Sequence, residues 1–260
     1  MTTPWDLDFA ARALHAGEEL YIGEWTCDGA WRPPSAEVIR HVELGLQRDG
    51  AHIRTVGRQR RVVDPTTATI NAIGDEVIMS PRAPQRATAL LFRGALAREL
   101  APLLARRFTH VSAEAARLHL RLLRTADPVA SQEAAFSLVD QITVDSGTRP
   151  EILDSSGPRW VLAEDIKHVI ATRFAERLTL ETIAVACGCS PFYASRVFRA
   201  VTGETIHRHL TRVRLRVALF KLEESAGRLT ELALAVGFSS HSHFTRAFRS
   251  EFGCAPSVSS

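Results

Sequence analysis

The sequence predicts an α+β protein of two domains. Short segments of β-type composition fill about the first 94 residues, the apolar residues then recur at helical spacing, and two helix-turn-helix patterns joined by a long helix follow. We therefore expect a β-barrel or sandwich over about residues 1–94 with trailing helices over 95–144, a linker over 145–158 and an all-α domain over 159–260.

The expected strands lie between turn signals such as Asp49-Gly50, Asp64-Pro65 and Gly74-Asp75. Many short strands at even spacing are typical of a small barrel or sandwich. The predicted strands are Leu20–Trp25, Glu37–Leu44, Ala51–Val56, Arg61–Val63, Thr67–Ile73, Glu76–Met79 and Ala87–Phe92.

Helical spacing begins at Ala95. A first segment carries Leu96, Leu100 and Leu104, a second begins after Ser112, and a third runs from Pro128 to about Val144. The residues that follow, DSGTRPEILDSSGP, are rich in Ser, Gly, Pro and Asp, which predicts a linker.

The first helix-turn-helix pattern follows a helix expected over about Val161–Phe174. Thr179 is placed to cap a short helix, Cys187 to Ser190 form the turn, and Pro191 stands at the first position of the next helix, where its missing N–H costs nothing. The spacing turns some residues of that next helix inward and leaves others for a partner. The inward set is Ala194, Val197 and Phe198, and the outward set is Phe192, Ser195, Arg196 and Arg199.

A long helix from Thr205 to about Leu222 connects this pattern to the second one. Arg208, Arg212 and Arg216 repeat every four residues on one of its faces. At 1.5 Å per residue the helix is roughly 27 Å long. It can therefore hold two reading helices about one DNA turn, roughly 34 Å, apart.

The second pattern occupies Leu229 to Ser257. Gly237 supplies the backbone freedom to stop its first helix, and Ser239 or Ser240 can cap the next. One face of that helix is an apolar stripe, and the other is polar, as in helices that place donors on base edges and phosphates. The stripe consists of Phe244, Phe248 and Phe252, and the polar face of His241, Ser242, Thr245, Arg246 and Arg249.

Composition and charge agree with a DNA-binding protein. The apolar fraction of 45% is typical of a folded, well-cored chain, and no run of apolar residues is long enough for a membrane span, so we expect a cytoplasmic protein that does not bind membranes. Residues 161–260 carry 13 Lys and Arg against 9 Asp and Glu, whereas the first 160 residues carry 19 against 20. The positive charge is thus concentrated beside the two helix-turn-helix patterns.

The four cysteines are too few and too unevenly spaced for a disulfide framework. Cys187 and Cys189 supply only half of a tetrahedral metal site, and we expect Cys187 to pack at the turn. His15, His41 and His52 do not have the spacing of a metal-binding histidine set, so we expect no metal, no cofactor and no catalytic residues.

The stretch from about Leu178 to Ser257 resembles the DNA-binding domain of the AraC/XylS family of bacterial transcriptional regulators. The string GF-x3-S-x-F-x-RAF-x3-FG, from Gly237 to Gly253, carries most of the resemblance, together with matching positions across the first pattern and the connecting helix. His243 departs from the pattern, since it replaces an aromatic residue before Phe244.

The resemblance implies a regulator, such as a transcriptional activator, that binds a promoter or operator in double-stranded DNA through two recognition helices. Bases would be read by Phe192, Ser195, Arg196, His241, Ser242, Thr245 and Arg246. Phosphates would be bound by Thr205, His207, Arg208, Arg212, Arg199 and Arg249. Arg214 faces another side of the connecting helix, which favours a structural pairing role.

The N-terminal part resembles the sensor half of such regulators, a cupin-like β-barrel followed by helices that form a homodimer. A small-molecule effector, of unidentified class, would bind there, and RNA polymerase is a further candidate partner. Trp25, Cys27, Trp31 and Phe92 are the candidate pocket residues, with plain core packing as the alternative. The segment Ala113–Arg124, with Leu118 and Leu122, is the candidate dimer seam or a cover for the barrel.

Two alternatives stay open at this point. A cupin-type enzyme with a DNA-binding tail would need converging catalytic His, Asp or Glu residues, and the sequence offers no such set. In the other alternative, the N-terminal domain only dimerises and the regulator needs no effector.

Overall fold

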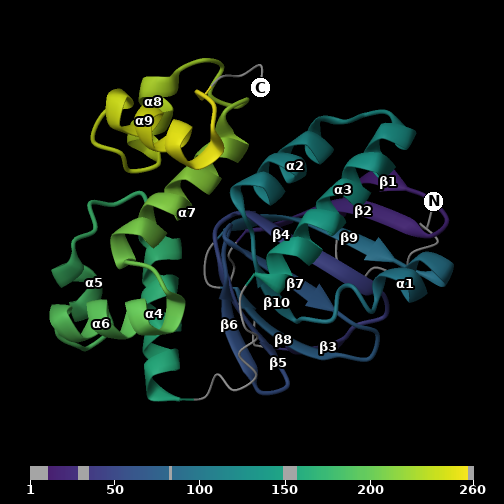
Figure 1. Ribbon diagram of the computed structural model, residues 1–260, viewed down its shortest axis with the longest axis horizontal. Helices are drawn as coiled ribbons and strands as arrows, with labels where there is room; N and C mark the ends of the chain where they lie inside the picture. The colour runs from purple at the N-terminus through teal and green to yellow at the C-terminus, as the bar shows by residue number, and fades with distance from the viewer. Residues whose placement is uncertain (1–10, 29–34, 82–83, 149–156, 257–260) are drawn as a thin grey trace. The chain divides into compact units, whose positions relative to one another are not determined.

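The computed structural model describes residues 11–28, 35–81, 84–148 and 157–256. Contacts divide the chain into two compact units, one made of Met1–Gly57 with Val63–Ile152 and the other of Arg58–Val62 with Leu153–Ser260. Sheets and three helices make up the first unit, and the helices α4 to α9 make up most of the second (Figure 1). The prediction of a sheet-rich N-terminal part and a helical C-terminal part is confirmed.

The larger sheet of the N-terminal unit has six antiparallel strands in the order β1-β2-β9-β4-β7-β10. Its central strands carry part of the core, with Ile22, Leu44, Ile70 and Leu90 fully buried. The strands are β1 (Ala11–Ala16), β2 (Leu20–Cys27), β4 (Val42–Asp49), β7 (Thr67–Asn71), β9 (Gln85–Phe92) and β10 (Phe108–His110).

The smaller sheet has four strands in the order β3-β8-β5-β6. They are β3 (Ser35–Val38), β5 (His52–Val56), β6 (Gln59–Val63) and β8 (Glu76–Pro81). The predicted strand Glu37–Leu44 is therefore two strands in different sheets. The chain turns at Ile39, whose N–H donates to the Asp75 carbonyl (2.9 Å) and whose carbonyl accepts from the Gly74 N–H (2.9 Å). The described strands form two open sheets, and the expected closed barrel is not among them.

Three helices accompany the sheets, α1 (Gly94–Leu100), α2 (Ala113–Arg124) and α3 (Pro128–Gly147). Ser112 caps α2, as expected from its position, by accepting from the Ala115 N–H at 3.1 Å. Helix α3 lies against α2 and β10 (Figure 1) and continues beyond the predicted end at Val144. Asp145, assigned to the linker, is helical, and its carboxylate accepts from the Ser112 N–H at 2.8 Å.

The C-terminal unit contains six helices among its described residues. A buried apolar cluster that includes Ile166, Ile170, Phe198 and Val213 joins the first four of them. The helices are α4 (Pro158–Arg173), α5 (Leu180–Ala186), α6 (Pro191–Thr202), α7 (Ile206–Lys221), α8 (Leu229–Ala235) and α9 (His241–Phe252). Over the described ranges no helix has both the length and the apolar character needed to cross a bilayer.

Candidate nucleic-acid interface

Helices α5 and α6 form the first helix-turn-helix. Thr179 and Thr182 form a reciprocal capping box at the start of α5, and Gly188 makes the turn with a φ of 65°. Ser190 then caps α6 by accepting from the Tyr193 N–H at 3.2 Å. The predicted cap at Thr179 and the predicted helix start at Pro191 are therefore confirmed.

The two faces of α6 differ as predicted. Its inner face packs Ala194, Val197 and Phe198 into the core. Phe192 is 71% exposed, an unusual position for a phenyl ring, and Arg196 places its guanidinium 5.6 Å from the ring centroid. Ser195 and Arg199 are also exposed. The outward face of α6 therefore combines the apolar ring of Phe192 with the guanidinium donors of Arg196 and Arg199.

Helices α8 and α9 form the second helix-turn-helix. Gly237 has a φ of 89°, and a Cβ there would lie 2.7 Å from the Phe174 carbonyl oxygen, so the turn requires glycine. Ser240, one of the two predicted caps, accepts from the His243 N–H at 3.2 Å. Phe244, Phe248 and Phe252 are buried as one stacked stripe.

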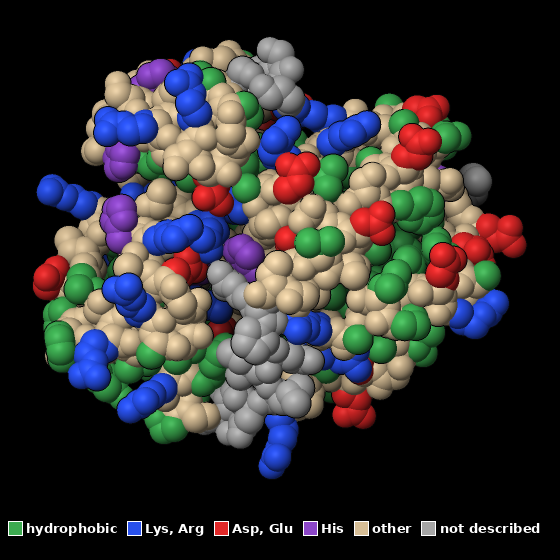
Figure 2. Space-filling view, viewed as in Figure 1, with side chains coloured by type: hydrophobic (Ala, Val, Ile, Leu, Met, Phe, Trp, Pro, Cys, Tyr) green, Lys and Arg blue, Asp and Glu red, His purple; other side chains and the backbone are tan. Residues whose placement is uncertain are grey.

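The opposite face of α9 is open. His241, Ser242, Thr245 and Arg246 line a shallow surface hollow together with Arg249 and Ser250. All are exposed except Thr245, which is half-buried. Figure 2 shows Lys, Arg and His side chains spread over the face of the C-terminal helices that is turned to the viewer.

Helix α7 connects the two motifs. Thr205 caps it by accepting from the Arg208 N–H at 3.2 Å, and the side chains of His207 and Arg208 are exposed at its first turn. These are the positions where a helix N-terminus offers N–H groups and positive charge to a phosphate.

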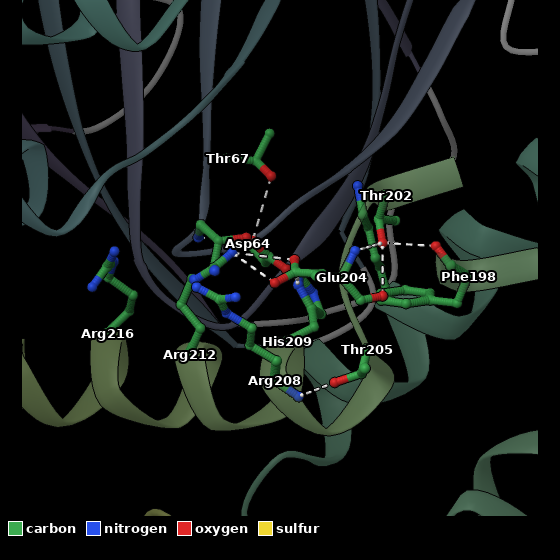
Figure 3. A network of polar contacts seen from close by, with 12 residues as sticks. Asp64, Thr67, Phe198, Thr202, Glu204, Thr205, Arg208, His209, Arg212 and Arg216 are labelled. Carbon is green, nitrogen blue, oxygen red and sulfur yellow. Dashed lines mark hydrogen bonds and ion pairs between the residues drawn. The ribbon is translucent and has the colours of Figure 1, made fainter. Parts of the chain in front are cut away.

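Arg212 does not belong to this exposed set, and its prediction as a phosphate contact is wrong. It is 8% exposed, and its guanidinium pairs with the Glu204 carboxylate (Nη1 to Oε2, 2.9 Å) while Nε lies 3.7 Å from Glu251. Figure 3 shows Glu204, His209 and Arg212 pointing toward one another, and the hydrogen bond from the Arg208 backbone N–H to the Thr205 hydroxyl. The four-residue spacing places Arg208, Arg212 and Arg216 on one face of α7, but only the first turn of that face, which carries Arg208, is exposed.

The buried ion pairs link the two motifs. Glu204 lies between α6 and α7, whereas Glu251 lies on α9 and also pairs with the fully buried Arg216 (Nη2 to Oε1, 3.0 Å). His209 adds a contact from its Nδ1 to Glu204 at 3.2 Å. We name Glu204, Arg212, Arg216 and Glu251 the bridging network, since it connects both helix-turn-helix motifs through α7.

The structural role predicted for Arg214 is confirmed. Its Nε donates to the Phe174 carbonyl at 2.8 Å and its Nη2 to the Glu176 carbonyl at 2.9 Å, so it binds the carbonyl groups at the end of α4. Cys187 packs against the core of the first motif, and burial raises the pKa of its thiol to about 11, so it is protonated and unreactive at neutral pH.

The candidate effector residues of the N-terminal unit do not share one site. Trp25 and Cys27 lie on one face of β2, because residues two apart on a strand point the same way. Phe92 pairs with Leu20 and lies on the other face of the same sheet, where it is fully buried. Grouping Phe92 with Trp25 was therefore wrong, and Trp31 lies outside the described residues.

A family model described as a helix-turn-helix domain matches residues 183–259, the stretch that holds both motifs. The regulatory protein SoxS of Salmonella typhimurium is 32% identical over 80 residues, which are 31% of this chain and 75% of SoxS. The chain belongs to the AraC family of transcriptional regulators.

Two further relatives match a similar share of this chain. The transcriptional activator RhaS of Escherichia fergusonii is 36% identical over 94 residues, 35% of this chain and 34% of RhaS. The solved C-terminal domain of the response regulator AraT from Geobacillus stearothermophilus is 28% identical with a TM-score of 0.36, over 38% of this chain and 81% of that domain. The chain spans between 34% and 45% of the length of the first curated relatives that it matches.

Proposed function

We propose that the chain is a sequence-specific DNA-binding regulator of transcription that reads two successive major grooves with α6 and α9. The observation that carries this proposal is the pair of capped helices with open polar faces, connected through α7 by the bridging network. Helix α7 has 16 residues, or about 24 Å at 1.5 Å per residue. That separation suits two helices entering the duplex one turn apart.

Base reading is proposed for the exposed faces of α6 and α9. On α6 these residues are Phe192, Ser195 and Arg196, and on α9 they are His241, Ser242, Thr245 and Arg246. Arginine is the best donor to guanine O6 and N7, and a phenyl ring can pack on a thymine methyl group. The phosphate contacts are Arg199, Thr205, His207, Arg208 and Arg249, all exposed.

The test is selection of a binding site from random double-stranded DNA, followed by interference mapping of the major-groove contacts. The proposal expects two short blocks of required bases whose centres lie about one helical turn, roughly 10 base pairs, apart. A single block, or binding without sequence preference, would contradict it.

For the N-terminal unit we propose a ligand-sensing role, with residues 1–144 as the sensor and dimerisation domain. Residues 145–158 are proposed as the linker, the first three of which continue α3, and residues 159–260 as the DNA-binding domain. The proposal of a bound ligand is supported by the polar side chains that lie between the two sheets, as described below. We also propose that this unit is cupin-like. We assign the chain no enzymatic activity and a cytoplasmic location, because AraC-family relatives such as SoxS and RhaS are named as regulators.

A homodimer is proposed through α3 rather than α2. Leu122 is buried inside its own unit, which favours the alternative that α2 covers the sheets. On α3, Val129, Phe136 and Val144 are exposed at a spacing of seven and eight residues, which places them on one helix face. RNA polymerase remains a proposed partner for activation. Cross-linking of the purified chain and of a Phe136→Asp variant tests the dimer: the wild type should cross-link to a dimer and the variant should not.

A further inference from the structure

A cluster of polar side chains lies between the two sheets of the N-terminal unit. His52 and Arg54 project from the same face of β5, because they are two residues apart. The His52 Nδ1 meets the Gln85 Oε1 of the larger sheet at 2.9 Å, so this face of β5 is directed at the other sheet. Gln47 on β4 donates to the same Gln85 oxygen at 2.9 Å. These four side chains are each at least nine-tenths buried.

Arg54 is the unusual member of the cluster. It is 8% exposed, and among the residues that the structure describes it forms no hydrogen bond and no ion pair, its Nε being shut off from water. Arginine stays charged in proteins, and a buried charge is expensive unless it is paired. The half-buried Arg48 of the same unit is paired, since its Nη1 contacts the Glu24 carboxylate at 2.5 Å.

Carboxylates lie near Arg54 without pairing to it. Burial lowers the pKa of the Arg54 guanidinium, and the charges of Glu43, Glu37 and Asp75 oppose that shift. Asp75 is already bound by Arg107 at 2.8 Å. Glu43 accepts one hydrogen bond, from the Asn71 amide at 3.0 Å. Among the described residues the Arg54 guanidinium has no ion pair, and the Glu43 carboxylate, on β4 of the opposite sheet, is bound by a neutral amide alone.

The neighbouring polar atoms are also unpaired among the described residues: His52 Nε2, Gln85 Nε2 and Asn71 Oδ1. Burial lowers the pKa of His52 to about 3, with a further contribution from Arg54, so the imidazole is neutral. Its Nδ1 faces a carbonyl oxygen and must carry the proton, which leaves Nε2 as an acceptor. Donors are therefore available on Arg54 and Gln85, and acceptors on Glu43, Asn71 and His52.

We propose that this cluster binds a free α-amino acid, with its carboxylate on Arg54 and its ammonium group on Glu43 and Asn71. This inference rests on the ligand-sensing role proposed above. A simple carboxylic acid would pair with Arg54 but add a second negative charge beside Glu43, and a neutral sugar would neutralise neither charge. A zwitterion pairs both with charge-assisted hydrogen bonds.

The experiment measures the melting temperature of the full chain with each of the twenty common amino acids at millimolar concentration. At least one should raise the melting temperature by several degrees, because a ligand that binds only the folded state stabilises it. For that amino acid, the N-acetyl derivative and the carboxamide should each lose the shift, since each lacks one of the two charges.

Variants separate a ligand contact from a structural role. Arg54→Met should melt no lower than the wild type without ligand, because it removes an unpaired buried charge, and it should lose the amino-acid shift. Arg48→Met, the matched control, should melt lower because it removes a paired charge and leaves Glu24 with the exposed Arg12 as its remaining arginine partner. A loss of stability in Arg54→Met as large as in Arg48→Met would overturn the proposal, as would the absence of any shift across the panel. If no amino acid shifts the melting temperature but the wild-type protein still binds its selected DNA site, the proposed DNA-reading function stands without the amino-acid site.

Discussion

Arg212 and Glu204 form a buried ion pair, 2.9 Å from Nη1 to Oε2, at the point where the first helix-turn-helix meets the connecting helix. Since Arg212 also approaches Glu251 on α9, the pair belongs to a network that reaches the second motif. The position of one recognition helix relative to the other therefore depends on charges that are hidden from DNA.

Replacing Glu204 with Gln should destabilise the C-terminal unit. The substitution leaves the Arg212 guanidinium buried without its main counter-charge, which costs about 3 kcal/mol of unfolding free energy. Urea unfolding measures the loss. Arg208→Ala is the matched control on the same helix, because Arg208 is exposed, and it should change stability by less than about 0.5 kcal/mol.

The Glu204 variant should also loosen the spacing between the motifs. Wild-type protein should bind poorly to a site with two base pairs inserted between its half-sites, whereas Glu204→Gln should discriminate less between the original and the lengthened site. Equal discrimination by both proteins would show that the bridging network stabilises the fold without setting the spacing.

Gly237→Ala should be more destabilising than Gly253→Ala. Both glycines have a φ above 70°, so both substitutions incur backbone strain of about 1 kcal/mol, but a Cβ at Gly237 would also meet the Phe174 carbonyl at 2.7 Å, whereas a Cβ at Gly253 meets nothing within 4 Å. Thermal melting of the two variants compares them directly. Equal melting temperatures would contradict the tight packing of the second turn.

Stability of the N-terminal unit should fall in mild acid. Burial lowers the pKa of both His52 and His119 to about 3. Below the ordinary histidine pKa of 6.5, both histidines bind protons in the unfolded chain but stay neutral in the folded chain. The free energy of unfolding is therefore highest above pH 6.5. It declines as the pH falls toward 3, by about 1.4 kcal/mol per pH unit per histidine.

His52→Gln should reduce the slope of unfolding free energy against pH, because it removes one of the two histidines that bind a proton only in the unfolded chain. Urea unfolding at a series of pH values between 7 and 4 provides the measurement. The exposed His207→Gln is the control and should leave the slope unchanged. A slope that His52→Gln does not alter would mean that other groups cause the acid sensitivity.

Much of the DNA-binding unit could be predicted because its signals are local. The Thr179 and Ser240 caps, the turn at Gly237 and the Phe244 to Phe252 stripe are each set by a few adjacent residues, and all of them are predicted from the sequence. The buried pairing of Arg212 was missed, because helical spacing tells which residues share a face and not whether that face is covered. Its partner Glu251 lies on another helix, which only the tertiary fold brings near.

The N-terminal unit was harder to predict for the same reason. The three-residue strand β10 has no recognisable pattern of its own and exists because it pairs with β7. The change of sheet at Ile39 depends on hydrogen bonds to Gly74 and Asp75. Arg54 lies in an ordinary β-type segment, and only the packing of two sheets makes it a buried, unpaired charge.

Arg208→Ala should weaken DNA binding to the same extent on every sequence. Arg208 is exposed at the start of α7, where it can meet a phosphate, and the loss of one phosphate contact should reduce the slope of log affinity against log salt concentration by about 1. Band-shift titrations at several salt concentrations measure both effects. Arg228→Ala, which removes an exposed arginine outside the reading helices, should leave the slope unchanged.

We propose that α6 and α9 each read their own half of the DNA site. The most direct measurement is site selection repeated with Arg196→Ala and with Arg246→Ala. Each variant should lose preference, by about 1 to 3 kcal/mol, at a few adjacent base pairs, and the two affected blocks should lie about one helical turn apart. Unchanged sequence preference in both variants, or loss at the same base pairs in both, would contradict the account.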